Sequence, residues 1–103
     1  MNRNQKRKRV NEMGISFMEK VMLASHIERK ISKLNIDNSE LEAKVYEDIE
    51  RQIKREFGIS RKHPCMKRKY LADAHELIDC YEAPIYLAEL IEGANSQINL
   101  GVA

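Results

Sequence analysis

Residues 39–58 decide the fold, and they read SELEAKVYEDIERQIKREFG. Within this stretch apolar residues recur every four positions, at Leu41, Val45, Ile49, Ile53 and Phe57. Side chains four apart lie on one face of an α-helix, so the spacing predicts a helix with a single apolar face. A helix of this kind must bury that face against other elements of the chain.

Both ends of this predicted helix carry their own signals. Ser39 and Glu42 have the spacing of a capping box, in which each side chain accepts a hydrogen bond from the other residue's backbone N–H. Gly58 follows Phe57 as the predicted stop, because a residue without a Cβ adopts the left-handed conformation at no steric cost. We therefore expect Ser39, Phe57 and Gly58 to have structural roles.

A second helix is predicted over residues 12–34, before this stretch. Its apolar residues recur at intervals of three and four. The expected buried stripe consists of Phe17, Val21, Ala24, Ile27, Ile31 and Leu34, and Met18 and Met22 widen it. Turn-forming residues at 35–38 then break the pattern.

Further helices are predicted after Pro64, which excludes a continuous helix between residues 59 and 66. A third helix is expected over residues 67–81, with Tyr70, Ala74 and Ile78 on its buried face. Pro84 suits the first turn of a fourth helix, where proline gives up no helical hydrogen bond. The apolar side chains expected in it are Ile85, Ala88, Leu90 and Ile91.

The composition agrees with an all-α fold. The chain has 103 residues, of which 33% are charged, with 4 Gly, 2 Pro and no Trp. This length is that of one domain, and charged residues are favoured in helices over strands. We expect a small bundle of three to four helices over residues 12–98. A disordered basic tail is expected at residues 1–11 and a frayed tail at 99–103.

Charge is strongly segregated along the chain although the net charge is only +2. The local sums are +5 for residues 1–9, −4 for 10–50, +7 for 51–70 and −6 for 71–103. The basic clusters could bind phosphates of a nucleic acid, or could pair with acidic residues of the same chain or of a partner subunit. The candidate nucleic-acid-binding residues are Arg3, Lys6, Arg7, Lys8, Arg9, Arg61, Lys62, Lys67, Arg68 and Lys69.

Catalytic and metal sites are not expected. Two histidines and two cysteines, His63, Cys65, His75 and Cys80, lack the close pairs typical of zinc sites. No phosphate-binding glycine loop or nucleophile motif accompanies them, so no enzyme and no cofactor are predicted. Residues 57–60 look like the turn of a helix-turn-helix, but Pro64 would interrupt its second helix.

Residues 45–60 resemble a known family, the C-terminal domain of phage antirepressor proteins. In that family a tyrosine-bearing helix ends in a Lys-Arg-x-Phe-Gly-Val type step, and this chain has KREFGI at residues 54–59. Tyr70, Ala74 and Ile78 match the family's aromatic-led later helix, and residues 91–97 match its polar tail. The likeness covers residues 18–97. The chain departs from the family at residues 61–66, and only a basic tail precedes the resemblance where the family usually has a DNA-binding domain.

The resemblance implies a small phage or prophage regulatory protein that acts without catalysis. We expect it to bind a repressor or another regulatory protein and to form a homo-oligomer. The alternative is an electrostatic DNA-binding protein that uses the basic tail and residues 51–70. No membrane partner is expected, and the absence of a signal-peptide pattern and of a disulfide spacing favours the cytoplasm of a bacterial host cell.

Overall fold

The structure, a computed structural model, describes residues 3–101, with side chains for all of these except residues 4, 7, 8 and 97–101. Over this range the fold is all-α, as the sequence predicts. The elements in chain order are α1 (Arg3–Glu12), α2 (Phe17–Lys33), α3 (Ser39–Glu56), the 3-10 turn η1 (Arg68–Tyr70), α4 (Leu71–Asp79) and α5 (Ile85–Gly101).

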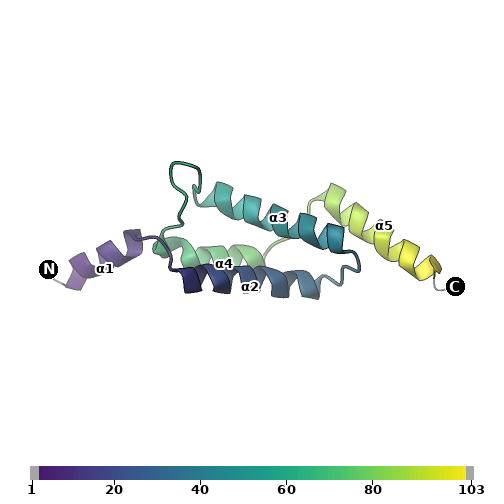
Figure 1. Cartoon of the computed structure of the whole chain (residues 1–103), viewed down its shortest axis with the longest axis horizontal. Coiled ribbons are helices and arrows are strands. Elements are labelled where there is room, and N and C mark those ends of the chain that lie inside the picture. The colour runs from purple at the N-terminus through teal and green to yellow at the C-terminus, as the bar shows by residue number, and fades with distance from the viewer. Residues whose placement is uncertain (1–2, 102–103) are drawn as a thin grey trace.

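The molecule is elongated, with extents of 69 × 22 × 20 Å. Helices α2, α3 and α4 lie side by side and form its body, while α1 and α5 project from opposite ends (Figure 1). The two termini are therefore at the two ends of the long axis.

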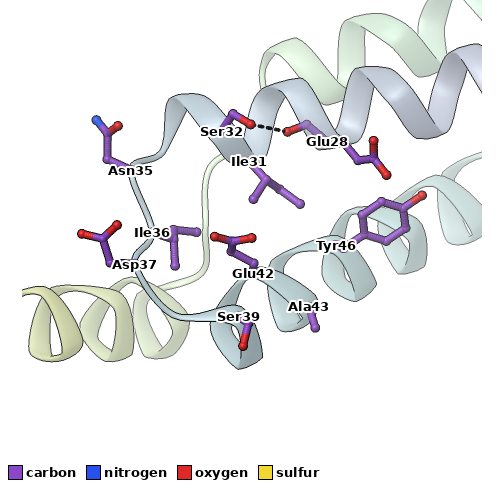
Figure 2. Close-up of a pocket in the computed structure, with 10 residues that line it drawn as sticks. All are labelled: Glu28, Ile31, Ser32, Asn35, Ile36, Asp37, Ser39, Glu42, Ala43 and Tyr46. Carbon is purple, nitrogen blue, oxygen red and sulfur yellow. Dashed lines mark hydrogen bonds between the residues drawn. The ribbon is translucent and has the colours of Figure 1, made fainter.

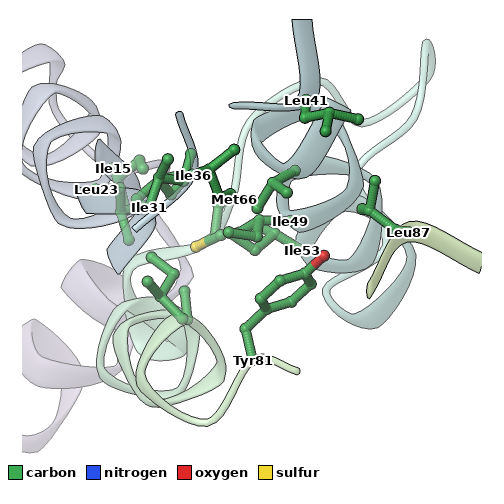
Figure 3. Close-up of a cluster of buried hydrophobic side chains, with 14 residues drawn as sticks. Ile15, Leu23, Ile31, Ile36, Leu41, Ile49, Ile53, Met66, Tyr81 and Leu87 are labelled. Carbon is green, nitrogen blue, oxygen red and sulfur yellow. The ribbon is translucent and has the colours of Figure 1, made fainter. Parts of the chain in front are cut away.

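The core is built around α3, whose apolar residues at intervals of four face inward (Figure 3). Leu41, Val45, Ile49 and Ile53 are buried. They meet Ala74 and Ile78 of α4, Leu87 of α5 and the buried residues of α2, so four helices share one core. Burial of this face stabilises the bundle by roughly 25 cal/mol for each Å² of apolar surface removed from water.

Asp48 is the one polar side chain buried within the described core. The Tyr81 hydroxyl donates a hydrogen bond of 2.7 Å to its Oδ2 atom, and the Gln52 amide donates a second of 3.1 Å. Burial, followed by the bond to Asp48, raises the pKa of Tyr81 far above its ordinary value. The buried carboxylate thus has the partners that it needs to avoid a large desolvation cost.

The cap of α3 differs from the sequence prediction. Asn38, not Ser39, is the N-cap, and its Oδ1 atom accepts a hydrogen bond of 3.1 Å from the Leu41 N–H. Asparagine and serine cap equally well, so the neighbouring Asn38 takes the position and Ser39 becomes the first helical residue. The capping box of this chain lies instead at the start of α2, between Ser16 and Glu19.

At the other end of α3, Gly58 has φ of +67° and lies just after the C-cap residue Phe57. The Ile59 N–H then returns to the carbonyl of Lys54 at 2.9 Å. Phe57 is half-buried, and its ring stacks on the Tyr70 ring with 5.5 Å between the centroids. Helix α3 therefore ends at Phe57 and Gly58, which belong to the segment that resembles the antirepressor domain.

The buried face of α2 agrees with the prediction at Ile27 and Ile31 and differs elsewhere. The helix buries Leu23, Ile27 and Ile31, whereas Phe17 and Val21 point into solvent. The helix starts at Phe17, not at residue 12. The apolar residues of α2 form two stripes, both with helical spacing, and only one of them faces the core.

Helix is assigned close to both ends of the described range. Residues 3–12, expected to lie mostly in a disordered tail, are helical in α1, which is rich in the good helix formers Lys, Arg and Gln. Helix α5 continues to Gly101 through part of the expected frayed tail, and residues 102–103 lie outside the described range. Among the described side chains of α5, Leu87 is buried. Of the expected apolar set, Ile91 packs partly against the core, whereas Ile85 and Leu90 are exposed.

Candidate functional site

The two basic segments of the sequence meet at one end of the molecule. Residues 13–15 run antiparallel to residues 66–68, with a bridge between Gly14 and Lys67. The Arg68 N–H donates to the Met13 carbonyl at 2.8 Å, and the Ile15 N–H donates to the Met66 carbonyl at 2.9 Å. These backbone hydrogen bonds hold α1 beside η1, so the basic segments 3–9 and 61–69 lie at the same end of the molecule.

Two of the predicted nucleic-acid-binding lysines are paired within the chain. Lys67 and Lys69 both reach Glu12, with N–O distances of 2.7 and 2.6 Å. Their hydrogen bonds hold the pKa of Glu12 at about 2 against an ordinary value of 4.5. Both lysines thus help to attach the end of α1 to η1.

Arg68 is paired as well. Its guanidinium contacts Glu19 through Nη2 at 2.8 Å and through Nε at 3.0 and 3.2 Å. The same carboxylate accepts from the Ser16 N–H, and these bonds, with that of Arg68 the strongest, lower the pKa of Glu19 to about 2. The ion pair connects residues 49 positions apart in the sequence, so it joins the start of α2 to η1.

Five of the other predicted basic residues are exposed to solvent. Arg61 and Lys62 are exposed in the loop after α3, and Arg3, Lys6 and Arg9 are exposed on α1. Arg7 and Lys8 lie in α1, and their side chains are outside the described part of the structure. Of the ten candidates, three therefore hold the fold together and five face solvent, while the side chains of Arg7 and Lys8 are not described.

An apolar surface lies at the same end of the molecule. Phe17, Met18, Val21 and Met22 are all exposed on one face of α2, and we call this set the α2 strip. Phe17 is 77% exposed and Met18 is 64% exposed. Exposed apolar clusters mark binding surfaces in soluble proteins, and methionine adapts easily to different partners. The sequence-based prediction placed all four residues in the buried stripe of this helix and so missed the strip.

A second exposed apolar set lies at the other end, on α5. Ile85, Tyr86 and Leu90 face solvent there, Ile85 with 80% of its surface exposed, and we call this set the α5 face. The helical spacing places Glu89 on the same side as Ile85. Residues 71–103 contain six acidic residues and no basic one. The α5 face is thus apolar, with the acidic Glu89 and Glu92 on its own helix and Lys44 of α3 beside Glu89 and Leu90.

The histidines and cysteines do not gather as ligands. His75 lies beside His26, with 2.7 Å between their Nδ1 atoms, and His26 Nε2 is 2.6 Å from Asp79 Oδ1. Burial, followed by the charge of His26, lowers the pKa of His75. This cluster joins α2 to α4. Cys65 and Cys80 are exposed free thiols, and within residues 3–101 no group of three or more His, Cys, Asp or Glu side chains could hold a metal ion.

An open hollow of about 610 Å³ lies at the turn between α2 and α3 (Figure 2). Ile31, Ile36 and Tyr46 form its apolar side, and Glu28, Asp37 and Glu42 border it with carboxylates. The only hydrogen bond drawn between its lining residues runs from the Ser32 hydroxyl to the Glu28 carbonyl, at 3.1 Å. The lining brings no histidine, cysteine or basic side chain to these carboxylates.

None of the helices described between residues 3 and 101 has the length and apolar character to cross a membrane. Comparison of the chain with curated proteins and with solved structures found no match. A family model does match: that of the ORF6C domain, over residues 4–91. The ORF6C domain is found in phage antirepressor-type proteins, as the likeness at residues 45–60 implies. Because the match spans most of its length, the chain belongs to the ORF6C domain family.

Proposed function

We propose that this chain is an antirepressor-like regulatory protein that acts by binding a repressor or another regulatory protein, without catalysis. Membership of the ORF6C family supports a phage-associated regulatory role. The observation that carries the proposal is the α2 strip, where four large apolar side chains face water on a helix whose opposite side is already in the core.

The strip has the properties of a protein-binding surface. Phe17 and Met18 are exposed to water in the free chain, so they contribute little to its stability. Their burial against a partner would be favourable by about 25 cal/mol for each Å² of apolar surface covered. Glu28 and Arg29 are both exposed on the strip side of α2, and α1 adds positive charge nearby. The surface therefore suits a partner that offers an apolar patch with acidic neighbours.

Affinity capture from infected or lysogenic cells tests the proposal, with and without nuclease. The bait is the full chain, compared with a Phe17→Gln/Met18→Gln variant and with the control Ala72→Gln on α4. Ala72 is exposed and outside the strip. A partner that is retained after nuclease, lost with the strip variant and kept with the control supports the proposal. A chain that retains no regulatory protein, or one that does so independently of the strip, contradicts it.

Electrostatic DNA binding is the second candidate, because the two basic segments meet at one end of the molecule. Affinity should then fall steeply as salt rises, since bound cations are released from the DNA. Arg61→Gln/Lys62→Gln is the informative variant, because these side chains are exposed, whereas Lys67, Arg68 and Lys69 also hold the fold. A gel shift that is insensitive to salt and to this variant would remove the candidate.

A further inference from the structure

The two exposed apolar sets of this chain are complementary in charge. The α2 strip lies at the end that carries α1, where residues 3–9 include five basic residues and no acidic one. The α5 face lies where α5 begins, at the other end of the body, with Glu89 and Glu92 on its own helix and Lys44 of α3 as the one basic residue that lines a hollow with Glu89 and Leu90. An apolar surface near a basic helix and an apolar surface on an acidic helix are thus present in every copy.

We propose that the α5 face of a second copy docks on the α2 strip. Phe17, Met18, Val21 and Met22 would then cover Ile85, Tyr86 and Leu90, and the acidic residues of α5 would approach the basic α1. Each set lies on the side of its helix that the core does not use, so the contact needs no change inside either copy.

The contact must come from another copy because a chain cannot make it with its own α5. The strip lies on the first turns of α2, whereas α5 packs against α3 and, within the described residues, not against α2. Helix α5 is also held in place, since Leu87 is fully buried in the core beside α3. Its own strip is therefore out of reach, while the strip of a second copy is accessible.

Charge also selects which surfaces pair. Strip against strip would bring two strongly basic ends together, and face against face would bring two acidic helices together. Like charges brought together across an interface oppose association, whereas strip against face joins opposite charges. Two copies side by side in opposite directions could make this contact at both ends.

The inference rests on the proposed function in one respect, the regulation of the α2 strip. If the strip binds a regulatory protein, the α5 face of a second copy covers the same residues. Self-association and partner binding then compete, and the concentration of the chain sets how much strip is available.

Mixing two variants tests the contact. Phe17→Gln/Met18→Gln alters the strip, Ile85→Gln/Tyr86→Gln alters the face, and Ala72→Gln is the control; all replace exposed helical residues by a good helix former. Analytical ultracentrifugation over a range of concentrations and salt measures association, with circular dichroism to verify folding. The wild type and the control should associate, more weakly in high salt. Each variant alone should show a dissociation constant about tenfold higher or more.

The equimolar mixture of the two variants gives the decisive result. One strip and one face remain intact between them, so association should return when one variant is labelled and titrated with the other. A wild type that is monomeric at every concentration overturns the inference, and so does a mixture that does not associate. In the capture experiment, a monomeric chain that retains a partner through its strip would leave the proposed function standing. A chain that associates but retains no partner would contradict the proposed function and leave this inference standing.

Discussion

Helices α2 and α3 are nearly equal in length, with 17 and 18 residues, yet they use their apolar residues differently. Helix α3 turns its single apolar stripe entirely into the core. Helix α2 has a buried stripe of Leu23, Ile27 and Ile31 and a second, exposed one in the α2 strip. Apolar residues in excess of those that the core can bury remain on the surface, where they mark a site for binding.

The largest effect is expected inside α3. Ile49 is fully buried, so Ile49→Ala should lower the free energy of unfolding by about 2–5 kcal/mol, from lost burial and from the cavity that remains. Urea denaturation followed by circular dichroism measures this. A loss below about 1 kcal/mol would show that α3 does not centre the core.

A smaller effect is expected at the starts of the two helices. Asn38→Ala and Ser16→Ala each remove a side-chain cap and should cost about 1 kcal/mol. Ser39→Ala is the matched control and should change stability by only a few tenths of a kcal/mol, about the size of an ordinary surface substitution. A greater loss for Ser39 than for Asn38 would return the cap to the position that the sequence predicts.

The Glu19–Arg68 ion pair, at the start of α2, should make the stability of the fold depend on pH in the acid range. Glu19 has a pKa of about 2 in the folded chain against an ordinary 4.5. Its contribution is therefore complete above pH 4.5 and is lost as the pH falls from 4.5 towards 2. Arg68→Gln should flatten the loss of stability in this window, as measured by thermal denaturation at a series of pH values. An unchanged slope would mean that the pair does not form.

The smallest effect is expected on the exposed side of α2. Phe17→Ala should change the free energy of unfolding by no more than about 0.5 kcal/mol when the chain is dilute enough to be monomeric. The measurement is the same urea denaturation as for Ile49→Ala. A cost similar to that of Ile49 would place the strip in the core and remove the difference between the two helices.

Sequence reasoning predicted α3 well because only one face of that helix is apolar. For α2 it was correct at Ile27 and Ile31 but wrong at Phe17 and Val21, since spacing alone does not say where another helix covers the apolar side. Leu87 was missed for a similar reason: exposed Ile85 and Leu90 flank it within the apolar start of α5.

The candidate site was predictable only in part. The sequence identified the basic segments and left open whether they bind phosphates or pair within the chain. For Arg68 and Lys69 the partners are 49 and 57 residues away, so only the fold could show those pairs. The α2 strip could have been recognised from the number of large apolar residues in residues 17–23, which is more than one helix face can accommodate.

The short bridge between Gly14 and Lys67 has a mechanical consequence. A Cβ on Gly14 would lie only 3.2 Å from the Cβ of Cys65, so the two chain segments pass closer there than most residues would permit. Any movement that pulls α1 sideways is transmitted through this bridge to residues 66–68. From there it passes along η1 to Tyr70, and through the stacked Phe57 to the end of α3. A load applied to the N-terminal helix would therefore reach the end of α3 through side chains that pack against one another.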